Sequence, residues 1–259
     1  MKNTQHVAPC GRCAACVANR RSEWATRLEY ELKDSKNADF ISLTYSEENK
    51  PINDYGNGML YKTDVQLFIK RLRKAEYPNK IRYYLCAEYG EQTFRPHYHM
   101  ILFNCSKTKD QLHELLLKTW NLGLIHIGEV NPASIKYITG YMVQQKQSST
   151  LSNEKIYERP FSLQSQGLGR SYIEKHKKWH KQDLTRLYVP KEGGNKVRLP
   201  RYYRDKIYSS TDKLKQKIML EANLEFDLQK EKDSFHTEID KKEQYKKKVL
   251  KSLKNNSKL

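Results

Sequence analysis

The sequence lacks long apolar runs. No stretch reaches the roughly 18 consecutive apolar residues that a membrane-spanning helix needs. The first residues, MKNTQHVAPCGRC, hold no apolar core of a secretory signal peptide. These two absences predict a protein of the cytoplasm that has no membrane partner and whose five cysteines stay reduced.

Acidic residues are also scarce relative to basic ones. The 259 residues include 30 Asp and Glu against 48 Lys and Arg, which gives a net charge of +18. A chain this basic attracts polyphosphates, and nucleic acid is the commonest of them. The 18 tyrosines add aromatic faces on which unpaired bases can stack. Composition therefore predicts a nucleic-acid-binding protein, with solvated lysine-rich tails as the alternative interpretation.

Hydrophobic periodicity predicts an α+β core. The pattern favours a strand at 38–45, a helix at 64–75 capped by Thr63, strands at 81–89 and 97–104, a helix opened by the capping pair Thr108 and Gln111, a strand at 124–130, and a helix from Asn131 to about 147. The order β-α-β-β-α-β is the ferredoxin-like arrangement. We expect a largely antiparallel sheet with helices on one face and the other face free for a ligand.

Composition shifts divide the chain into four segments. We expect an N-terminal cysteine-containing segment and helix at 1–37, the ferredoxin-like core at 38–147, a loop-rich extension packed on the core at 148–212, and a charged, helix-compatible and basic tail at 213–259. Within the extension, QGLGRSY (166–172) has two glycines whose backbone amides are candidates for cradling phosphate. A plain turn is the alternative interpretation of this loop.

Two histidines stand two apart in FRPHYHMILFN (94–104). Side chains alternate along a strand, so His97 and His99 point the same way and are candidates for binding a metal ion. Glu88 on the preceding strand is a candidate third ligand, with Glu91 and Asp54 as rivals. Two imidazoles and one carboxylate leave positions open for phosphate oxygens, which suits Mg²⁺ or Mn²⁺ acting as a Lewis acid. The alternative is one satisfied polar histidine with an incidental neighbour.

Two tyrosines lie one helical turn apart. Tyr137 and Tyr141 share a face of the last predicted helix of the core. A phenol oxygen can attack a phosphodiester held on a metal, which would leave a phosphotyrosine and a free 3′-hydroxyl. Lys136 and Lys146 are placed to hold phosphates or to stabilise a phenolate. Simple packing of the two rings is the alternative.

Three cysteines form the pattern C-x₂-C-x₂-C at Cys10, Cys13 and Cys16. Three thiols this close together can bind zinc, although a structural zinc site wants four ligands. The candidates for the fourth ligand are His6, Cys86 and Cys105. Reduced thiols without a metal are the alternative.

Three stretches, FISLTY, CAEYGEQTFRPHYHMILF and YITGYMVQQK, resemble the three motifs of the HUH endonucleases in the right order. The opening PCGRCAACVANRRSEWATRLEYEL and the late LPRYYRDKIY narrow the resemblance to the replication initiators of microviruses, with the gokushovirus group most similar. The resemblance spans roughly residues 8–210. It implies the HUH endonuclease fold for the core.

The resemblance also implies an activity. Such initiators nick one strand of circular phage DNA at an origin, stay linked to its 5′ end through tyrosine, and rejoin the displaced strand after one round of rolling-circle replication. His97 and His99 match the metal-binding pair, and Tyr137 and Tyr141 match the two-tyrosine pattern. Related initiators often carry Lys directly before the second tyrosine; this position is Gly140 here, and we expect Lys146 to take the role.

The implied partners are single-stranded DNA and origin DNA in the host bacterial cytoplasm, together with a host polymerase. The chain has no G-x₄-GK[ST] nucleotide-binding loop, so a host helicase must unwind the duplex. Basic residues near the motifs are expected to contact DNA: Arg95, Lys136, Arg12, Arg20 and Arg21. Two alternatives remain, a noncatalytic single-stranded nucleic-acid-binding module with the same layout and a transposase or relaxase of the same superfamily.

Overall fold

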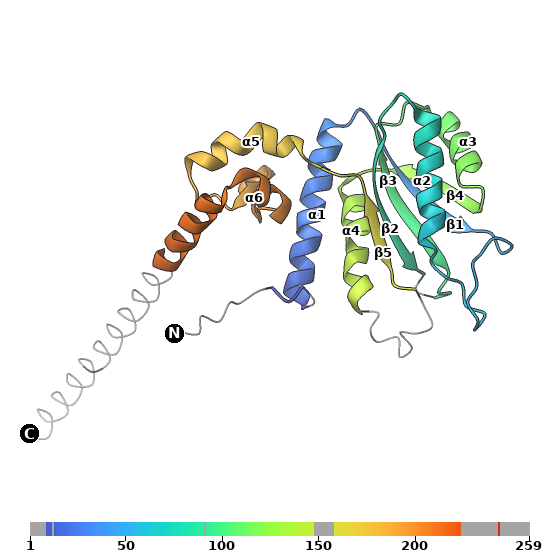
Figure 1. Cartoon of the computed structure of the whole chain (residues 1–259), viewed down its shortest axis with the longest axis horizontal. Helices are drawn as coiled ribbons and strands as arrows, with labels where there is room; N and C mark the ends of the chain where they lie inside the picture. Colours follow the sequence, from blue (N-terminus) through green and yellow to red (C-terminus); the bar gives the residue numbers. More distant parts are fainter. Residues whose placement is uncertain (1–8, 12, 91, 148–157, 224–242, 244–259) are drawn as a thin grey trace, which may run out of the picture. The chain divides into compact units, whose positions relative to one another are not determined.

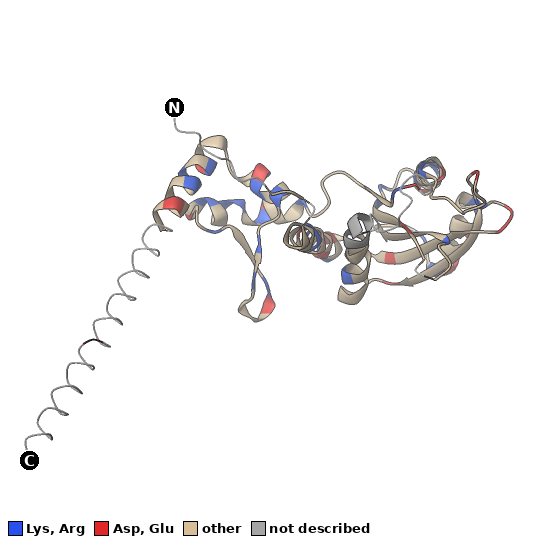
Figure 2. Cartoon of the chain, turned by 90° about the horizontal axis from the view of Figure 1, so that it is seen from below, with Lys and Arg blue, Asp and Glu red and all other residues tan. Residues whose placement is uncertain are grey.

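The computed structural model of this protein describes residues 9–11, 13–90, 92–147, 158–223 and 243, with the backbone alone at 142–147. The chain divides into two compact units. The larger unit holds Met1–Lys178 and Leu187–Lys206, and the smaller unit holds Trp179–Arg186 and Ile207–Leu259. Basic positions are found in both units (Figure 2). Among the helices that the structure describes, none combines the length and the apolar character needed to cross a lipid bilayer.

A five-stranded sheet organises the larger unit (Figure 1). Its strands are β1 (Ala38–Tyr45), β2 (Arg82–Tyr89), β3 (Pro96–Phe103), β4 (Gly123–Glu129) and β5 (Phe161–Gln164). They lie in the order β4-β1-β3-β2-β5, and every neighbouring pair is antiparallel. The first four strands keep the order 4-1-3-2 of a ferredoxin-like fold. The predicted α+β fold class is confirmed, and β5 adds one strand at the β2 edge.

Helices cover both faces of this sheet (Figure 1). Helices α2 (Lys62–Glu76) and α3 (Lys109–Thr119) pack on one face, and α1 (Ala14–Asp34) and α4 (Pro132–Gln147) pack on the other. Our expectation of one free face is therefore wrong. The cause is visible in β3, where Met100 faces the α2 side and Ile101 faces the α1 and α4 side, so both faces carry apolar side chains that need cover.

The helix starts test the capping predictions. The capping box of Thr108 and Gln111 is present at α3, and the Asn131 side chain accepts the Ser134 amide at 2.9 Å, so both predictions are confirmed. Thr63 is not the cap of α2: that helix begins one residue earlier, after Tyr61. The Tyr61 amide donates to the Tyr98 hydroxyl at 2.8 Å, so a tertiary contact sets this start.

The stretch that we expected to be loop-rich contains regular elements. After β5 come α5 (Ser171–Gln182), β6 (Tyr188–Pro190), the 3₁₀ helix η2 (Glu192–Gly194), β7 (Lys196–Arg198) and α6 (Arg201–Ile207). Strands β6 and β7 pair as a hairpin. Elements of three or four residues are too short to show a period in the sequence, which is why this prediction was wrong.

The smaller unit has its own buried polar centre. The His180 side chain is fully buried, and its Nδ1 lies 2.8 Å from the Arg186 carbonyl oxygen. The Tyr208 hydroxyl donates to the same carbonyl at 3.2 Å. The predicted charged tail begins as a helix over 210–223, and the rest of it, apart from residue 243, lies outside the described residues.

Candidate active site

Strand β3 carries both candidate histidines to the face that α4 covers. His97 lies opposite Thr44 on β1 and Glu88 on β2, and His99 lies opposite Ser42 and Cys86. Ile101 and Phe103, which have the same parity, pack in the core below α1 and α4. The two imidazoles therefore share a face and belong to the central strand of the sheet.

Hydroxyl groups from β1 orient the two imidazoles. Ser42 Oγ lies 3.0 Å from His99 Nδ1, and Thr44 Oγ1 lies 3.2 Å from His97 Nδ1. Because each Nδ1 has a partner, the Nε2 atoms are the ones directed toward a ligand. His99 Nε2 already lies 3.0 Å from Glu88 Oε1, and both side chains are largely buried.

The surroundings favour the neutral form of His97. Burial lowers the pKa of His97 below its ordinary value, and the nearby His99 and Arg95 lower it further. Neutral imidazole is the form that binds a metal ion. Gly90 leaves room for this ring, since a Cβ atom at position 90 would lie 3.0 Å from His97 Nε2.

The donor set suits a divalent metal by its chemistry. Glu88, His97 and His99 offer one carboxylate and two imidazoles, a mixed set that Mn²⁺ and Mg²⁺ accept. The imidazole rings of His97 and His99 lie 6.5 Å apart, centroid to centroid. Of the rival ligands, Asp54 is exposed in the loop after β1, and Glu91 lies outside the described residues.

Helix α4 presents the two tyrosines to this site in different environments. The Tyr141 ring stacks on His99 at 5.2 Å with an interplanar angle of 7°, and Tyr141 is only 9 % exposed. Tyr137 meets Tyr141 edge to face at 4.7 Å and is 52 % exposed. Burial raises the pKa of the Tyr141 phenol, and hydrogen bonds with Tyr137 and Glu88 add to the effect. Phe40 completes the aromatic group against His99.

The candidate cations are placed unequally. Lys136 is exposed on α4, and Arg20 is exposed on α1. Arg21 donates to the Lys136 carbonyl oxygen at 3.0 Å. Arg95 pairs with Glu47 and donates to the Tyr45 carbonyl oxygen, so its guanidinium is already engaged within the chain. Arg12 lies outside the described residues, and the Lys146 side chain is not among those described.

Several supporting residues escaped our sequence analysis. Ser42, Thr44 and Phe40 were not singled out, although they share one parity in ADFISLTY and so one face of β1. Polar residues at alternate positions of an otherwise apolar strand were the available signal. No local signal marks Gly90 as the neighbour of His97, because their contact forms only when β2 and β3 pair.

Comparisons with known proteins identify this part of the chain. Residues 38–146, from the start of β1 into the last turn of α4, match the family model of the phage replication-associated protein ORF2. The core is a replication-associated domain of this family. The matched range contains both histidines, Glu88 and both tyrosines. No solved structure matches the chain.

Three phage proteins are similar to a larger part of the sequence. The replication-associated protein VP4 of Bdellovibrio phage phiMH2K is 27 % identical over 76 % of this chain, and the replication-associated protein ORF2 of Spiroplasma virus 4 is 28 % identical over 75 %. The replication-associated protein ORF4 of Chlamydia phage 1 is 26 % identical over 79 %. The chain spans 66 % of the length of the first two relatives and 54 % of the third. The predicted resemblance to microvirus replication initiators is confirmed.

The cysteine cluster lies at the start of α1, just before the replication-associated domain. The sulfur atoms of Cys10, Cys13 and Cys16 all lie within 4.8 Å of one another, and Cys13 is the N-cap of the helix. Three thiols so arranged form a group that could bind a metal such as zinc.

The structure limits the choice of a fourth ligand for this cluster. Cys86 is buried and donates to the Ile138 carbonyl oxygen, so it belongs to the core beneath α4. Cys105 is buried in the other core, on the α2 and α3 side. Both were candidates for the fourth ligand, and both are wrong because the sheet holds them elsewhere. His6 lies outside the described residues.

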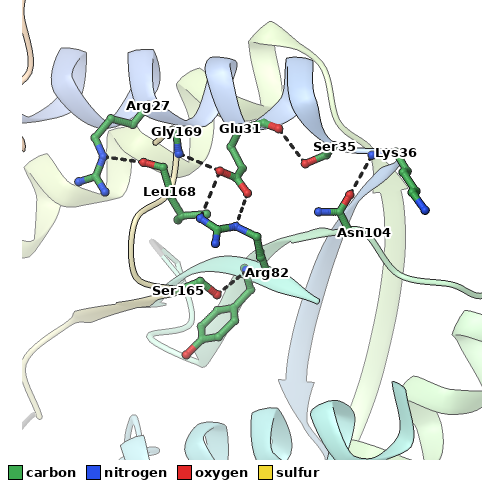
Figure 3. A network of polar contacts seen from close by, with 10 residues as sticks. Arg27, Glu31, Ser35, Lys36, Arg82, Asn104, Ser165, Leu168 and Gly169 are labelled. Carbon is green, nitrogen blue, oxygen red and sulfur yellow. Dashed lines mark hydrogen bonds and ion pairs between the residues drawn. The ribbon is translucent and has the colours of Figure 1, made fainter. Parts of the chain in front are cut away.

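The glycine-rich loop QGLGRSY is held by an internal carboxylate (Figure 3). The Gly169 amide donates to Glu31 Oε2 at 2.8 Å, and Arg82 pairs with the same carboxylate. A Cβ on Gly169 would lie 2.6 Å from the Arg27 carbonyl oxygen, and its φ of +71° also favours glycine. The Gly169 amide is therefore engaged in joining the loop to α1, and this favours the plain-turn interpretation over the phosphate cradle.

Proposed function

We propose that this protein is a replication initiator that nicks and rejoins single-stranded DNA at a phage origin in rolling-circle replication. The observation that carries the proposal is the stacking of Tyr141 on His99, with Glu88 at hydrogen-bond distance from the same imidazole. Packing alone does not require two tyrosines, two histidines and a carboxylate to meet at one end of a sheet. The similarity to phage replication-associated proteins supports DNA as the substrate.

Glu88, His97 and His99 would hold a divalent Mg²⁺ or Mn²⁺ ion. When bound, the ion supplies Lewis-acid stabilisation of the charge that builds on the phosphate oxygens. Ser42 and Thr44 keep both Nε2 atoms directed toward that ligand. The aromatic group of Phe40, Tyr137 and Tyr141 beside the imidazoles limits the access of water.

The chemistry is two transesterifications. In the first, a phenol Oη forms a bond to phosphorus, the P–O3′ bond breaks, the phenol loses its proton, and the leaving oxygen gains one to become a 3′-hydroxyl. In the reverse sense, a 3′-hydroxyl attacks the phosphotyrosine and restores the phosphodiester. We propose that Tyr137 acts first because it is 52 % exposed. Tyr141, whose phenol is hydrogen-bonded to Glu88, has a carboxylate at hand to accept its proton in the second transfer.

The partners follow from this chemistry. The protein would bind origin DNA and single-stranded DNA, leave the 3′ end to a host polymerase, and depend on a host helicase for unwinding, in the cytoplasm of a bacterial host. A transposase or relaxase would share the chemistry but not the replication context. The names of the similar phage proteins favour replication.

The test is a denaturing gel of the full chain with end-labelled single-stranded origin DNA and Mn²⁺, with and without a chelator. We expect a protein-linked DNA band that the chelator abolishes. Tyr137→Phe should remove most of this band, Tyr141→Phe should reduce it less, and the double variant should show none. Tyr77→Phe is the matched control, because Tyr77 is 83 % exposed at the end of α2. Tight binding without any covalent product would instead support the noncatalytic binding module.

We also propose that Cys10, Cys13 and Cys16 bind zinc. Burial raises the pKa of Cys86 to about 12 and that of Cys105 to about 11, so only the N-terminal thiols should react quickly with a thiol reagent near pH 8. Adding Zn²⁺ to the full chain should protect all three. Unchanged reactivity of the three thiols at saturating Zn²⁺ would contradict the site.

A further inference from the structure

Helix α1 carries two adjacent arginines in different surroundings. Arg20 is exposed, whereas Arg21 is half-buried. The Arg21 Nη2 atom donates to the Lys136 carbonyl oxygen at 3.0 Å, although the two residues are 115 positions apart in the sequence. The Arg21 guanidinium is therefore held against the first turns of α4, next to the residue that precedes Tyr137.

Gly140 provides the surface on which this guanidinium lies. A Cβ atom at position 140 would be 3.6 Å from Arg21 Nη2 and 3.8 Å from Arg21 Cζ, which is ordinary van der Waals contact. Residues three apart are neighbours on a helix surface, so Gly140 adjoins Tyr137. Arg21 thus lies along the same flank of α4 as the exposed phenol. A side chain longer than that of alanine at position 140 would compete for its place.

The charge of Arg21 is not compensated by the described part of the chain. Arg95 pairs with Glu47 and Arg82 with Glu31. Among the described residues, no carboxylate lies within 4.0 Å of the Arg21 side-chain nitrogens, in contrast to those two arginines. A guanidinium has five N–H donors, and the contact to Lys136 leaves others for a ligand. An arginine held in place by one carbonyl with its charge free is suited to bind a phosphate.

We infer that Arg21 is the residue that binds the scissile phosphodiester from the α1 side and neutralises its charge while Tyr137 attacks. The inference rests on the proposed nicking function and names a phosphate-binding residue of that site outside the range 38–146 that the family model matches. Arg20, one position earlier, contributes only general attraction to the DNA backbone. Gly140 is needed because the guanidinium occupies the space that a long side chain would fill.

The experiment compares single-turnover rates of adduct formation for the full chain on a labelled single-stranded origin oligonucleotide with Mn²⁺. Removing one preorganised donor from a transition state costs about 10²-fold in rate, and we expect this loss for Arg21→Ala. Arg21→Lys should recover part of the rate, because it keeps the charge and loses the fork geometry. Arg20→Ala is the matched control and should change the rate less than about threefold, since it removes an exposed charge only.

Two further comparisons separate phosphate binding from a structural role. On an oligonucleotide with a neutral methylphosphonate at the cut position, the rate difference between the unchanged chain and Arg21→Ala should collapse, because there is no phosphate charge to neutralise. Gly140→Ala should keep the rate, whereas Gly140→Leu should lose it as Arg21→Ala does, without removing the arginine.

Equal rates for Arg21→Ala and Arg20→Ala on the phosphodiester would overturn the inference. A penalty of the same size on the methylphosphonate would overturn it too, by assigning Arg21 a packing role. Absence of an adduct with the unchanged chain is a different result, because it rejects the proposed nicking function itself.

Discussion

At the scale of single residues, the candidate site depends on side chains that never touch the substrate. Ser42 and Thr44 hold the two Nδ1 atoms, and Gly90 leaves room for the His97 ring. Such second contacts typically change metal affinity or activity by 10–100-fold, roughly as much as a weak ligand does. They follow from strand pairing, because β1 lies directly beside β3.

Replacing these hydroxyl groups should weaken the dependence on metal rather than on DNA. For Ser42→Ala and Thr44→Ala we expect the Mn²⁺ concentration that gives half-maximal adduct formation to rise about tenfold. Ser46→Ala is the matched control, since its hydroxyl accepts only from Asn49 in the loop after β1. A Mn²⁺ titration of each variant at fixed DNA measures the effect. Identical midpoints for all three variants would show that the hydroxyl contacts do not tune the histidines.

At the scale of elements, the two threonines proposed as helix caps give a direct contrast. Thr108 accepts the Gln111 amide at 3.4 Å in the capping box of α3, whereas Thr63 lies inside α2. Thr108→Ala should lower the free energy of unfolding by about 1 kcal/mol, the usual cost of losing an N-cap. Thr63→Ala should be neutral or slightly stabilising, because alanine has the higher helix propensity. Urea unfolding of the two variants checks both; a larger loss for Thr63→Ala would contradict this assignment of the helix starts.

A second prediction at this scale concerns the junction that Figure 3 shows. Glu31 of α1 joins Arg82 of β2 to the Gly169 amide. Its side chain is about one tenth exposed, so Glu31→Ala leaves a guanidinium and an amide without their common partner. We expect a loss of about 3 kcal/mol in the free energy of unfolding, as is typical of breaking a buried pair.

The matched control for this junction is Glu29→Ala. Glu29 pairs with Lys191 but is more exposed, so its loss should cost less than about 1 kcal/mol. Denaturant midpoints of the two variants decide the matter. Equal costs would mean that the buried network holds α1 no better than a surface pair does.

At the scale of the whole molecule, the net charge of +18 predicts binding that is steeply dependent on salt. Each phosphate contact to a single strand contributes a slope of about −0.7 in log K against log salt. We expect Lys136→Ala, which removes an exposed cation, to flatten the slope by about that amount. Arg95→Ala should leave the slope nearly unchanged, because Arg95 is paired with Glu47. Fluorescence anisotropy at several salt concentrations provides the measurement, and a flat response of the unchanged chain would reject the electrostatic interpretation.

The sequence alone determined the order of the core elements and the residues with the right chemistry. Periodicity located the four strands of the core to within one residue at each end, and strand parity placed His97 and His99 on one face with Glu88. Helical spacing placed Tyr137 and Tyr141 on one face of α4. These features are local, since each depends on side chains a few positions apart on one element.

Only the tertiary structure decided what surrounds these residues. It covered the second face of the sheet with α1 and α4, engaged Arg95 with Glu47, and placed Arg21 on the helix that carries the tyrosines. It also buried Tyr141 and left Tyr137 exposed, although the two have the same chemistry. Each of these features joins segments far apart in the sequence. Such contacts arise from strand pairing and from the burial of apolar surface on both faces of the sheet, and a local pattern does not encode them.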